Sequence, residues 1–384
     1  MFKWEADNMF FRQFAVCVLL ICVFVSWISA DETKETAKLP KLESTDAYLI
    51  RGNDSLRNSE YDKAIADYTE AIRLNPKSDK AHFNRGMSWR AKGEFDKAIK
   101  DCTEAIRLNP KYANAYYNRG LTWIGKGNRD EAIADFAEAI RLKPTYADAY
   151  YNRAVLREMK GEYAKAIFDF TRAIRLKPKL YEAYYNRGAL FAKLGKLDRA
   201  IADANEAIRL NPRDARAYAN LGTCRNRKGE FDKAIAALTE AIRLNPKYAH
   251  AHFNRGVVWF NKDDIDKAIA DFGEAIRFNP MYAEAYYSRG FGWRAKGEYD
   301  KAIKDHTEAI RLNPNFAVAY YDRGVAWWKK RDLGKSIADF TEVIRLSPKN
   351  AKAYYNPGLA WKKKGDKAKA EADFKKAKAL GFSP

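Results

Sequence analysis

Apolar and charged residues between Asp96 and Pro110 follow the period of an amphipathic helix. The apolar positions are Ala98, Ile99, Cys102, Ala105, Ile106 and Leu108, with charged residues between them. This spacing places one apolar stripe along one side of a helix. We expect Asp96 to cap its start. Asn109 and Pro110 end it, because proline has no amide hydrogen and disfavours helix in the residue before it.

The segment before it, from Ala81 to Gly93, predicts another helix. Phe83, Trp89 and the small Gly86 fall on one face, and Gly93 suits the left-handed conformation that ends many helices. The two segments together predict a helix, a tight turn and a second helix.

The same pattern recurs every 34 residues. Nine prolines keep this period: Pro76, Pro110, Pro144, Pro178, Pro212, Pro246, Pro280, Pro314 and Pro348. A fixed period of this length predicts a repeat array, in which each unit contacts mainly its neighbours. Counted from Thr45, the ten repeats are 45–78, 79–112, 113–146, 147–180, 181–214, 215–248, 249–282, 283–316, 317–350 and 351–384. The turn glycine is replaced by Asp263 and Arg331 in the seventh and ninth repeats, where we expect looser turns.

The repeats resemble the tetratricopeptide repeat (TPR). Their fourth place is tyrosine, as in Tyr48, in all repeats except those with His82 and His252. Their twentieth place is alanine except at Ser336, and their twenty-seventh is alanine except at Val343. The resemblance implies an all-α fold, a right-handed superhelix of ten helix-turn-helix repeats. It also implies a non-catalytic scaffold that binds extended or acidic segments of other proteins along a concave groove.

Asparagine occupies the sixth place of six successive repeats. These residues are Asn84, Asn118, Asn152, Asn186, Asn220 and Asn254, and Asn356 repeats the pattern in the tenth repeat. In the TPR family the first helices line the concave surface. The ladder resembles that in the repeat arm of the O-linked N-acetylglucosamine transferases, which grips the backbone of an extended polypeptide. An amide offers a donor and an acceptor, which suits a peptide backbone of any sequence. The alternative is that these asparagines bond to neighbouring helices.

An aromatic series in the fifth place runs beside the ladder. Its candidate contacts with a bound segment are Tyr117, Tyr151, Tyr185 and Tyr287. Rings with a polar tip give a large contact area at low entropic cost. Packing between adjacent repeats is the other use that we expect of each ring.

The sixth repeat departs from the others. Ala219 replaces the usual aromatic residue, Leu221 the usual arginine and Arg225 the usual tryptophan. Arg216 and Arg227 fall in the second and thirteenth places, which face inward in the family. A small residue flanked by arginines favours a pocket for a carboxylate or phosphate. Drift in a single repeat is the alternative.

The tenth repeat carries nine lysines against three acidic residues, with Pro357 inside its first helix. Because proline removes a helix hydrogen bond, we expect this helix to be kinked or shortened. The lysines suit a solvated repeat at the end of an array, or contact with an acidic partner, lipid head groups or nucleic acid.

Catalytic and cofactor motifs are missing from the sequence. It has no phosphate-binding glycine-lysine loop, nucleophile elbow, Cys-x-x-Cys or His-Glu-x-x-His. Three of the four histidines replace core aromatic residues, and only His250 falls in a groove-facing place. We therefore expect no enzyme activity, no cofactor, no metal and no small-molecule substrate.

The first 30 residues resemble a secretory signal. The run 14–25 is apolar and uncharged, follows Arg12 and precedes a segment of mostly small residues that ends at Ala30. A membrane span needs about 20 apolar residues, so cleavage after Ala30 and an uncleaved tether through residues 9–30 are both open. Residues 31–44 read as a polar linker. We expect the repeats outside the cytoplasm, either exported (periplasmic or secreted) or membrane-anchored.

Two other functions fit parts of the sequence. The ladder fits a repeat subunit of a glycosyltransferase assembly, but the repeats leave no residues for a sugar-nucleotide domain, so activity would need a separate chain. A basic helical-repeat array can also bind single-stranded RNA, and this chain has 70 Lys and Arg against 50 Asp and Glu. The export signal argues against RNA.

Overall fold

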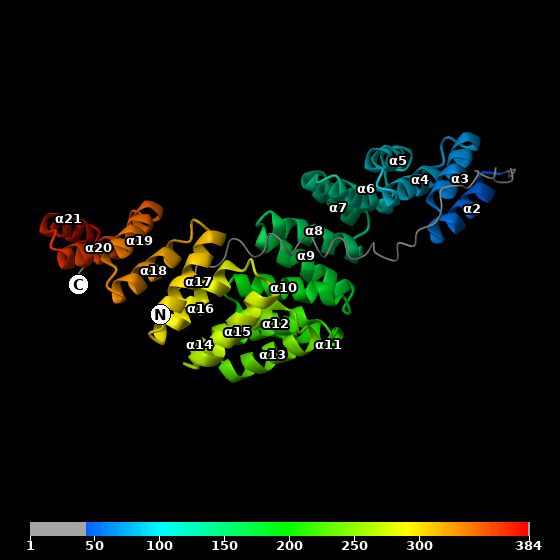
Figure 1. Cartoon of the computed structure of the whole chain (residues 1–384). Helices are drawn as coiled ribbons and strands as arrows, with labels where there is room; N and C mark the ends of the chain where they lie inside the picture. Colours follow the sequence, from blue (N-terminus) through cyan, green and yellow to red (C-terminus); the bar gives the residue numbers. More distant parts are fainter. Residues whose placement is uncertain (1–43, 383–384) are drawn as a thin grey trace, which may run out of the picture. The chain divides into compact units, whose positions relative to one another are not determined.

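The computed structural model describes residues 44–382, which form paired helices without a strand (Figure 1). The first helices of the repeats are α2 (Thr45–Arg57), α4 (Asp79–Ala91), α6 (Ala113–Gly125), α8 (Ala147–Met159), α10 (Tyr181–Lys193), α12 (Ala215–Arg227), α14 (Ala249–Asn261), α16 (Ala283–Ala295), α18 (Ala317–Lys329) and α20 (Ala351–Lys364). The second helices are α3 (Tyr61–Leu74), α5 (Phe95–Leu108), α7 (Arg129–Leu142), α9 (Tyr163–Leu176), α11 (Leu197–Leu210), α13 (Phe231–Leu244), α15 (Ile265–Phe278), α17 (Tyr299–Leu312), α19 (Leu333–Leu346) and α21 (Lys367–Ala379). Each first helix begins at the first residue of a predicted repeat. The predicted all-α TPR solenoid is confirmed.

The predicted signal segment 1–30 and all of the linker except Ser44 lie outside the described residues. Ser44 caps α2, because its Oγ accepts a hydrogen bond of 3.2 Å from the Ala47 amide.

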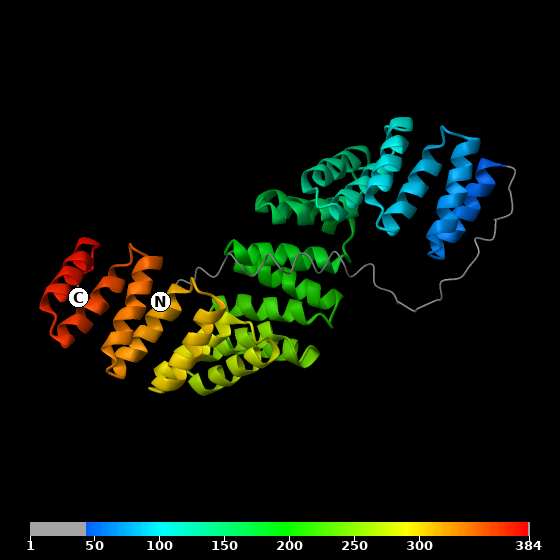
Figure 2. The same ribbon diagram turned by 45° about the horizontal axis from the view of Figure 1, so that its top comes forward.

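The described chain forms two compact parts, divided in sequence between Leu194 and Gly195. The N-terminal part holds α2 to α10 and the C-terminal part holds α11 to α21; Figure 2 shows the helices of each part from a second direction. First helices of adjacent repeats also contact one another: α2 with α4 and α4 with α6 in the N-terminal part, and α12 with α14, α14 with α16 and α16 with α18 in the C-terminal part. We call the surface made by their second, fifth, sixth, ninth, twelfth and thirteenth places the first-helix face.

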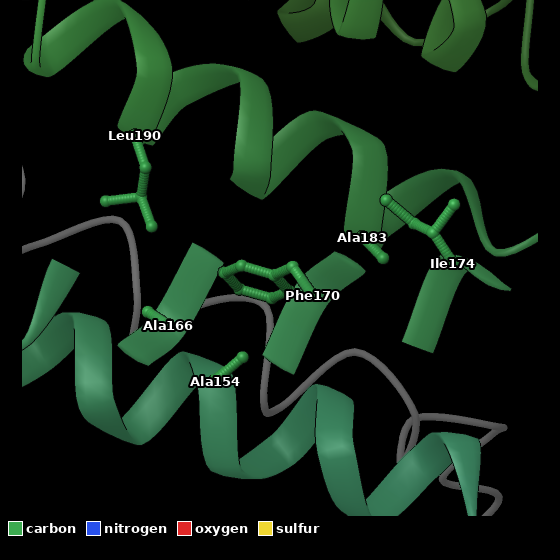
Figure 3. Packing of buried hydrophobic residues seen from close by; sticks show 6 residues of the cluster. All are labelled: Ala154, Ala166, Phe170, Ile174, Ala183 and Leu190. Carbon is green, nitrogen blue, oxygen red and sulfur yellow. The ribbon is translucent and has the colours of Figure 1, made fainter. Parts of the chain in front are cut away.

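Small residues let the two helices of a repeat approach closely. In the fourth repeat, Phe170 of α9 lies in the middle of a buried cluster that also contains Ala154, Ala166, Ile174, Ala183 and Leu190 (Figure 3). In the third repeat, a Cβ atom added at Gly120 would lie 2.8 Å from the ring of Phe136. The second-helix ring therefore fills the space left by a glycine or alanine of the first helix, and one added methyl group forces a shift.

The turn between the two helices keeps one geometry whether or not glycine is present. Gly93 has φ 81°, and Asp263 and Arg331 adopt the same left-handed region with φ 64° and 65°. The Asp263 amide donates to the Phe260 carbonyl at 3.0 Å, as the Gly93 amide does to that of Arg90. The expectation of looser turns was wrong, because the hydrogen bonds of the turn hold these side chains in a conformation that costs roughly 1–2 kcal/mol.

Asp96 does not cap α5. The helix begins at Phe95, the cap residue is Glu94, and no side-chain hydrogen bond caps this end. Asp96 instead lies in the first turn and accepts a bond of 2.5 Å from Lys126 of the next repeat. Equivalent pairs, which we call the lysine–aspartate ladder, are Lys92–Asp62, Lys160–Asp130, Lys228–Asp198, Lys262–Asp232, Lys296–Asp266 and Lys330–Asp300. This lysine–aspartate ladder joins the turn of each of these repeats to the second helix of the repeat before it.

A buried ion pair joins the two helices inside most repeats. In the third repeat, the Arg119 guanidinium donates to both carboxylate oxygens of Asp135 at 2.7 and 2.8 Å. In the sixth repeat the two places hold Leu221 and Ala237, which are buried together in one apolar cluster. Leu221 and Ala237 together therefore replace the ion pair of the other repeats with an apolar contact.

Pro357 does not shorten its helix. It lies inside α20, which runs without interruption from Ala351 to Lys364 and ends at Gly365 in the left-handed conformation. Proline stands where the other repeats place the ion-pair arginine, so Asp373 of α21 has lost that partner. Burial raises the pKa of Asp373.

Candidate binding surface on the first helices

The ladder asparagines donate their amide hydrogens to the protein itself. Asn152 Nδ2 donates to the Tyr117 hydroxyl at 2.9 Å, and Asn186 Nδ2 donates to the Tyr151 hydroxyl at 3.2 Å. Asn356 makes the same bond of 2.8 Å to Tyr321. The sixth place of one repeat is thereby tied to the fifth place of the repeat before it.

Three other ladder residues use different acceptors. Asn84 donates to Asn53 Oδ1 at 2.9 Å, and Asn254 donates to Thr223 Oγ1 at 3.1 Å. Asn118 is buried and donates to the Asn114 carbonyl of its own helix at 2.9 Å. Asn220 is half-buried on α12. The alternative prediction was that these asparagines bond to neighbouring helices. It is confirmed for Asn84, Asn152, Asn186 and Asn254. Each of these bonds uses one of the two hydrogens on Nδ2, which leaves the second hydrogen and the amide oxygen without a partner among the described residues.

The fifth-place rings pack against other aromatic rings of their own repeat. The Tyr117 ring lies 4.7 Å from that of Tyr146, and burial raises the pKa of Tyr117 to about 12. Tyr151 packs 5.8 Å from Phe170, and Tyr185 is half-buried. Most of each ring is therefore packed inside the protein and stabilises the array. Only the solvent-exposed part of each ring can contact a ligand.

Tyr287 also occupies the fifth place, but its ring has no exposed edge. It is buried, its ring lies 5.1 Å from Phe316, and its hydroxyl donates to Asp322 Oδ2 at 2.8 Å.

The two arginines of the predicted anion pocket are not brought together. Arg216 donates from Nε and Nη2 to the two carboxylate oxygens of Asp214 at 2.9 and 2.8 Å. Arg227 is eleven residues further along α12, about 16 Å at 1.5 Å per residue. Ala219 is buried between helices. The sixth repeat thus supplies its own carboxylate to Arg216.

The histidines and cysteines lie away from any reactive arrangement. His82 and His252 contact the carbonyls of Pro76 and Pro246 at 3.2 and 3.0 Å. His250 contacts the Tyr282 hydroxyl at 3.2 Å, and burial lowers its pKa to about 4. Cys102 and Cys224 are buried free thiols. Between residues 44 and 382 no group of His, Cys, Asp or Glu has the arrangement of a metal site.

Sequence reasoning missed three charged residues in the twelfth place of the first-helix face. They are Arg90, Glu158 and Arg294, where other repeats have residues such as Ile124 and Phe260. Burial lowers the pKa of Arg90 and raises that of Glu158 to about 7. The sequence alone could have shown them, because six of the ten repeats have an uncharged residue in this place.

The fold and this surface define a helical-repeat protein whose candidate site is an extended face and not a pocket. Models of the tetratricopeptide repeat match residues 51–113, 147–180, 181–214, 204–236, 225–283 and 328–384, and a TPR repeat model matches 125–161 and 294–330. The chain belongs to the tetratricopeptide repeat family. Proteins with such repeats generally mediate protein–protein interactions.

Solved structures with similar folds include the APC/C hetero-tetramer Cut9–Hcn1. It has 18% identity and a TM-score of 0.53, over 82% of this chain and 76% of that one. A TPR protein from Parabacteroides merdae has 22% identity and a TM-score of 0.51, over 65% and 98%. YrrB, described as a TPR protein with an unusual peptide-binding site, has 26% identity and a TM-score of 0.46, over 50% and 98%. These likenesses concern the fold. No curated protein matches the chain.

No helix in the described range 44–382 has the length and apolar character needed to span a bilayer. The predicted tether, residues 9–30, lies outside that range.

Proposed function

We propose that this protein is a non-catalytic scaffold that binds extended segments of other proteins along its first-helix face. The observation that carries the proposal is the row of ladder asparagines, which recurs every 34 residues on the first helices of each part. Each tied amide is held in a fixed orientation, so its oxygen can accept from a backbone amide of any sequence. Within each part, a row of such acceptors matches an extended chain better than a folded surface.

Partly exposed apolar side chains stand beside the amides in the N-terminal part. Met87, Leu121 and Val155 in the ninth place are all half-buried. Apolar area beside fixed hydrogen-bonding groups is the usual composition of a peptide-binding surface. This part therefore suits segments that combine backbone contacts with apolar anchors.

The first-helix face of the C-terminal part favours acidic segments. Lys329, Lys352, Lys362 and Lys363 are exposed there, and Lys329 and Lys363 lie 5.4 and 5.3 Å from the ring centre of Trp328. Clustered cations raise the association rate of anionic partners and make binding depend on salt. The apolar run 14–25 supports export of the scaffold, released or tethered.

The likeness to the transferase repeat arm stays a prediction that rests on the ladder. It agrees with this proposal, because in both cases the array holds polypeptide and the repeats do no chemistry.

A displayed library of random linear peptides tests the proposal on the full chain. Wild type should enrich peptides, and the fourfold variant with Asn118, Asn152, Asn186 and Asn220 changed to alanine should lose affinity for all of them by a similar factor. The matched control changes Asn211 and Asn313, whose side chains accept from backbone amides in the loops after α11 and α17, and should bind as wild type does. Equal enrichment of peptides by wild type and the fourfold variant would refute the role of the asparagine ladder in binding.

A further inference from the structure

A cavity of about 510 Å³ lies beside the buried His82 in the second repeat. Its volume is within the range of about 300–1,000 Å³ that is typical of ligand pockets. The first helix contributes only its fourth and seventh places to the walls, so the cavity is separate from the first-helix face. Its lining includes Ile72 and Pro76 from the end of the first repeat, and His82, Arg85, Lys100 and Glu104 from the second.

A tyrosine ring fills the equivalent space in the fourth repeat. The ring centre of Tyr150 lies 5.7 Å from the guanidinium carbon of Arg153 and 5.9 Å from that of Arg172. The ring also belongs to one buried cluster with Ile140. These three neighbours stand in the places of three residues that line the cavity, Arg85, Glu104 and Ile72. The cavity is therefore the space that the tyrosine ring occupies in a repeat with the usual fourth-place residue.

His82 leaves that space open. Its Nε2 contacts the Pro76 carbonyl at 3.2 Å, and its Nδ1 lies 3.5 Å from Oδ1 of Asp101. Both ring nitrogens thus face polar groups of the surrounding chain. The imidazole, which is smaller than a phenol, is held against the wall of the cavity.

The seventh repeat also has histidine in this place, and there the chain supplies an aromatic ring of its own. His252 contacts the Pro246 carbonyl at 3.0 Å, and the Phe278 ring centre lies 5.4 Å from that of His252. The second repeat has Leu108 in the place of Phe278. The fourth and seventh repeats therefore show two ways of placing an aromatic ring here, and the second repeat uses neither.

Among the described residues, Lys100 is the cation of this cavity that forms no ion pair. Arg85 donates to both carboxylate oxygens of Asp101 at 2.7 and 2.8 Å. Glu104 accepts bonds of 2.9 and 2.7 Å from Arg107. Lys100 is exposed and pairs with neither carboxylate. An acidic residue of a ligand can therefore meet Lys100 without displacing an existing pair.

We propose that this cavity binds the ring of a phenylalanine or tyrosine in a segment of a partner protein, with an acidic residue next to that ring meeting Lys100. The incoming ring takes the place that Tyr150 fills in the fourth repeat, against Ile72 and the guanidinium of Arg85. Burial of the ring and its contact with the cation both favour binding. This inference goes beyond the proposed function, because the cavity lies outside the first-helix face and selects one kind of side chain.

The tyrosine side chain as a free molecule, p-cresol, tests the cavity without any peptide. In the full chain with ¹³C-labelled isoleucine methyl groups, the Ile72 signal, assigned with Ile72→Val, should shift with saturation on addition of p-cresol. His82→Tyr restores the usual ring and should abolish this shift. Phe278→Leu gives the seventh repeat the same two residues as the second, so the Ile242 signal should then respond. An Ile72 signal that ignores p-cresol, or that shifts equally in His82→Tyr, overturns the proposal.

Peptides then separate the cavity from the first-helix face. The displayed library is selected on wild type, on His82→Tyr and on the fourfold asparagine variant. Some peptides should bind wild type and the fourfold variant equally and lose affinity for His82→Tyr about tenfold, the effect of burying one ring. Such peptides should carry phenylalanine or tyrosine beside an acidic residue, and Lys100→Glu should weaken them too. A library without any peptide that binds His82→Tyr more weakly than wild type overturns the cavity while the scaffold function stands. Peptides of this kind in a library that the fourfold variant otherwise enriches unchanged refute the asparagine ladder alone.

Discussion

Replacement of His306 by phenylalanine is expected to stabilise the C-terminal part. His306 of α17 is fully buried, with its ring 5.5 Å from that of Tyr287. Both ring nitrogens lack a hydrogen-bond partner among the described residues. The equivalent place holds Phe136, Phe170, Phe272 and Phe340 in other repeats, against the same first-helix glycine or alanine. Phenylalanine therefore fits the space without new polar atoms.

The size of the gain follows from two costs that phenylalanine removes. A buried polar atom without a partner costs about 1–3 kcal/mol, so we expect a gain of about 2 kcal/mol at pH 8. Burial, with smaller effects of Arg294 and Arg323, lowers the pKa of His306 to about 3, below its ordinary 6.5. The unfolded chain therefore takes up a proton that the folded chain does not, and stability falls as pH drops below about 6.5. At pH 5 this adds about 2 kcal/mol, for a total near 4 kcal/mol.

Urea unfolding of the full chain at pH 8 and pH 5 measures both costs, and amide hydrogen exchange in α17 assigns the change to the eighth repeat. Phe272→His is the reverse control in the seventh repeat and should lose stability, more so at pH 5. A His306→Phe gain that is the same at both pH values would contradict the buried neutral imidazole. A variant less stable than wild type at pH 8 would contradict the claim that the ring nitrogens are unpaired.

Three further changes test other parts of the reasoning. Glu158 has its pKa raised by burial to about 7, so its contribution to stability is present below pH 4.5 and is lost as pH rises through 7. Glu158→Gln should be more stable than wild type by about 1–3 kcal/mol at pH 8 and equal to it at pH 4, as urea midpoints would show. Leu221→Arg should destabilise the sixth repeat by about 3 kcal/mol, and Ala237→Asp in the same chain should recover most of it in a double-mutant cycle of unfolding free energies. No recovery would mean that the ion pair of the other repeats depends on more than these two places. Gly120→Ala should cost about 1–3 kcal/mol, because its Cβ meets the Phe136 ring at 2.8 Å, whereas Gly273→Ala, with 3.8 Å to the nearest atom, should gain up to about 1 kcal/mol on thermal unfolding.

The helices and their pairing were predictable because a strict period reports packing directly. Ala98, Gly86 and Pro110 each meet a local requirement, close helix approach or a helix end, that recurs from repeat to repeat. Turn geometry was less predictable, since Asp263 and Arg331 adopt a glycine-like conformation that composition argues against. Hydrogen bonds across several residues decide that conformation.

The sequence predicted which helices carry the candidate site, but not the contacts that its side chains make. The asparagine ladder lies on the first helices, but its bonds to tyrosines such as Tyr117 depend on distances between repeats. Leu221 was interpreted as part of a groove departure, although its true partner is Ala237, sixteen residues away.

The lysine–aspartate ladder has a consequence for how the array comes apart. At the junction of the ninth and tenth repeats, Gly334 stands where the aspartate should be, so Lys364 has no ladder pair to make. The tenth repeat also lacks the internal arginine, because Pro357 replaces it. Apolar contact is then the main tie at this junction. High salt strengthens apolar contact and weakens the seven junctions that carry a lysine–aspartate pair. Pulled from its C-terminus, the protein should release this repeat first in dilute buffer, as a discrete step in the extension trace.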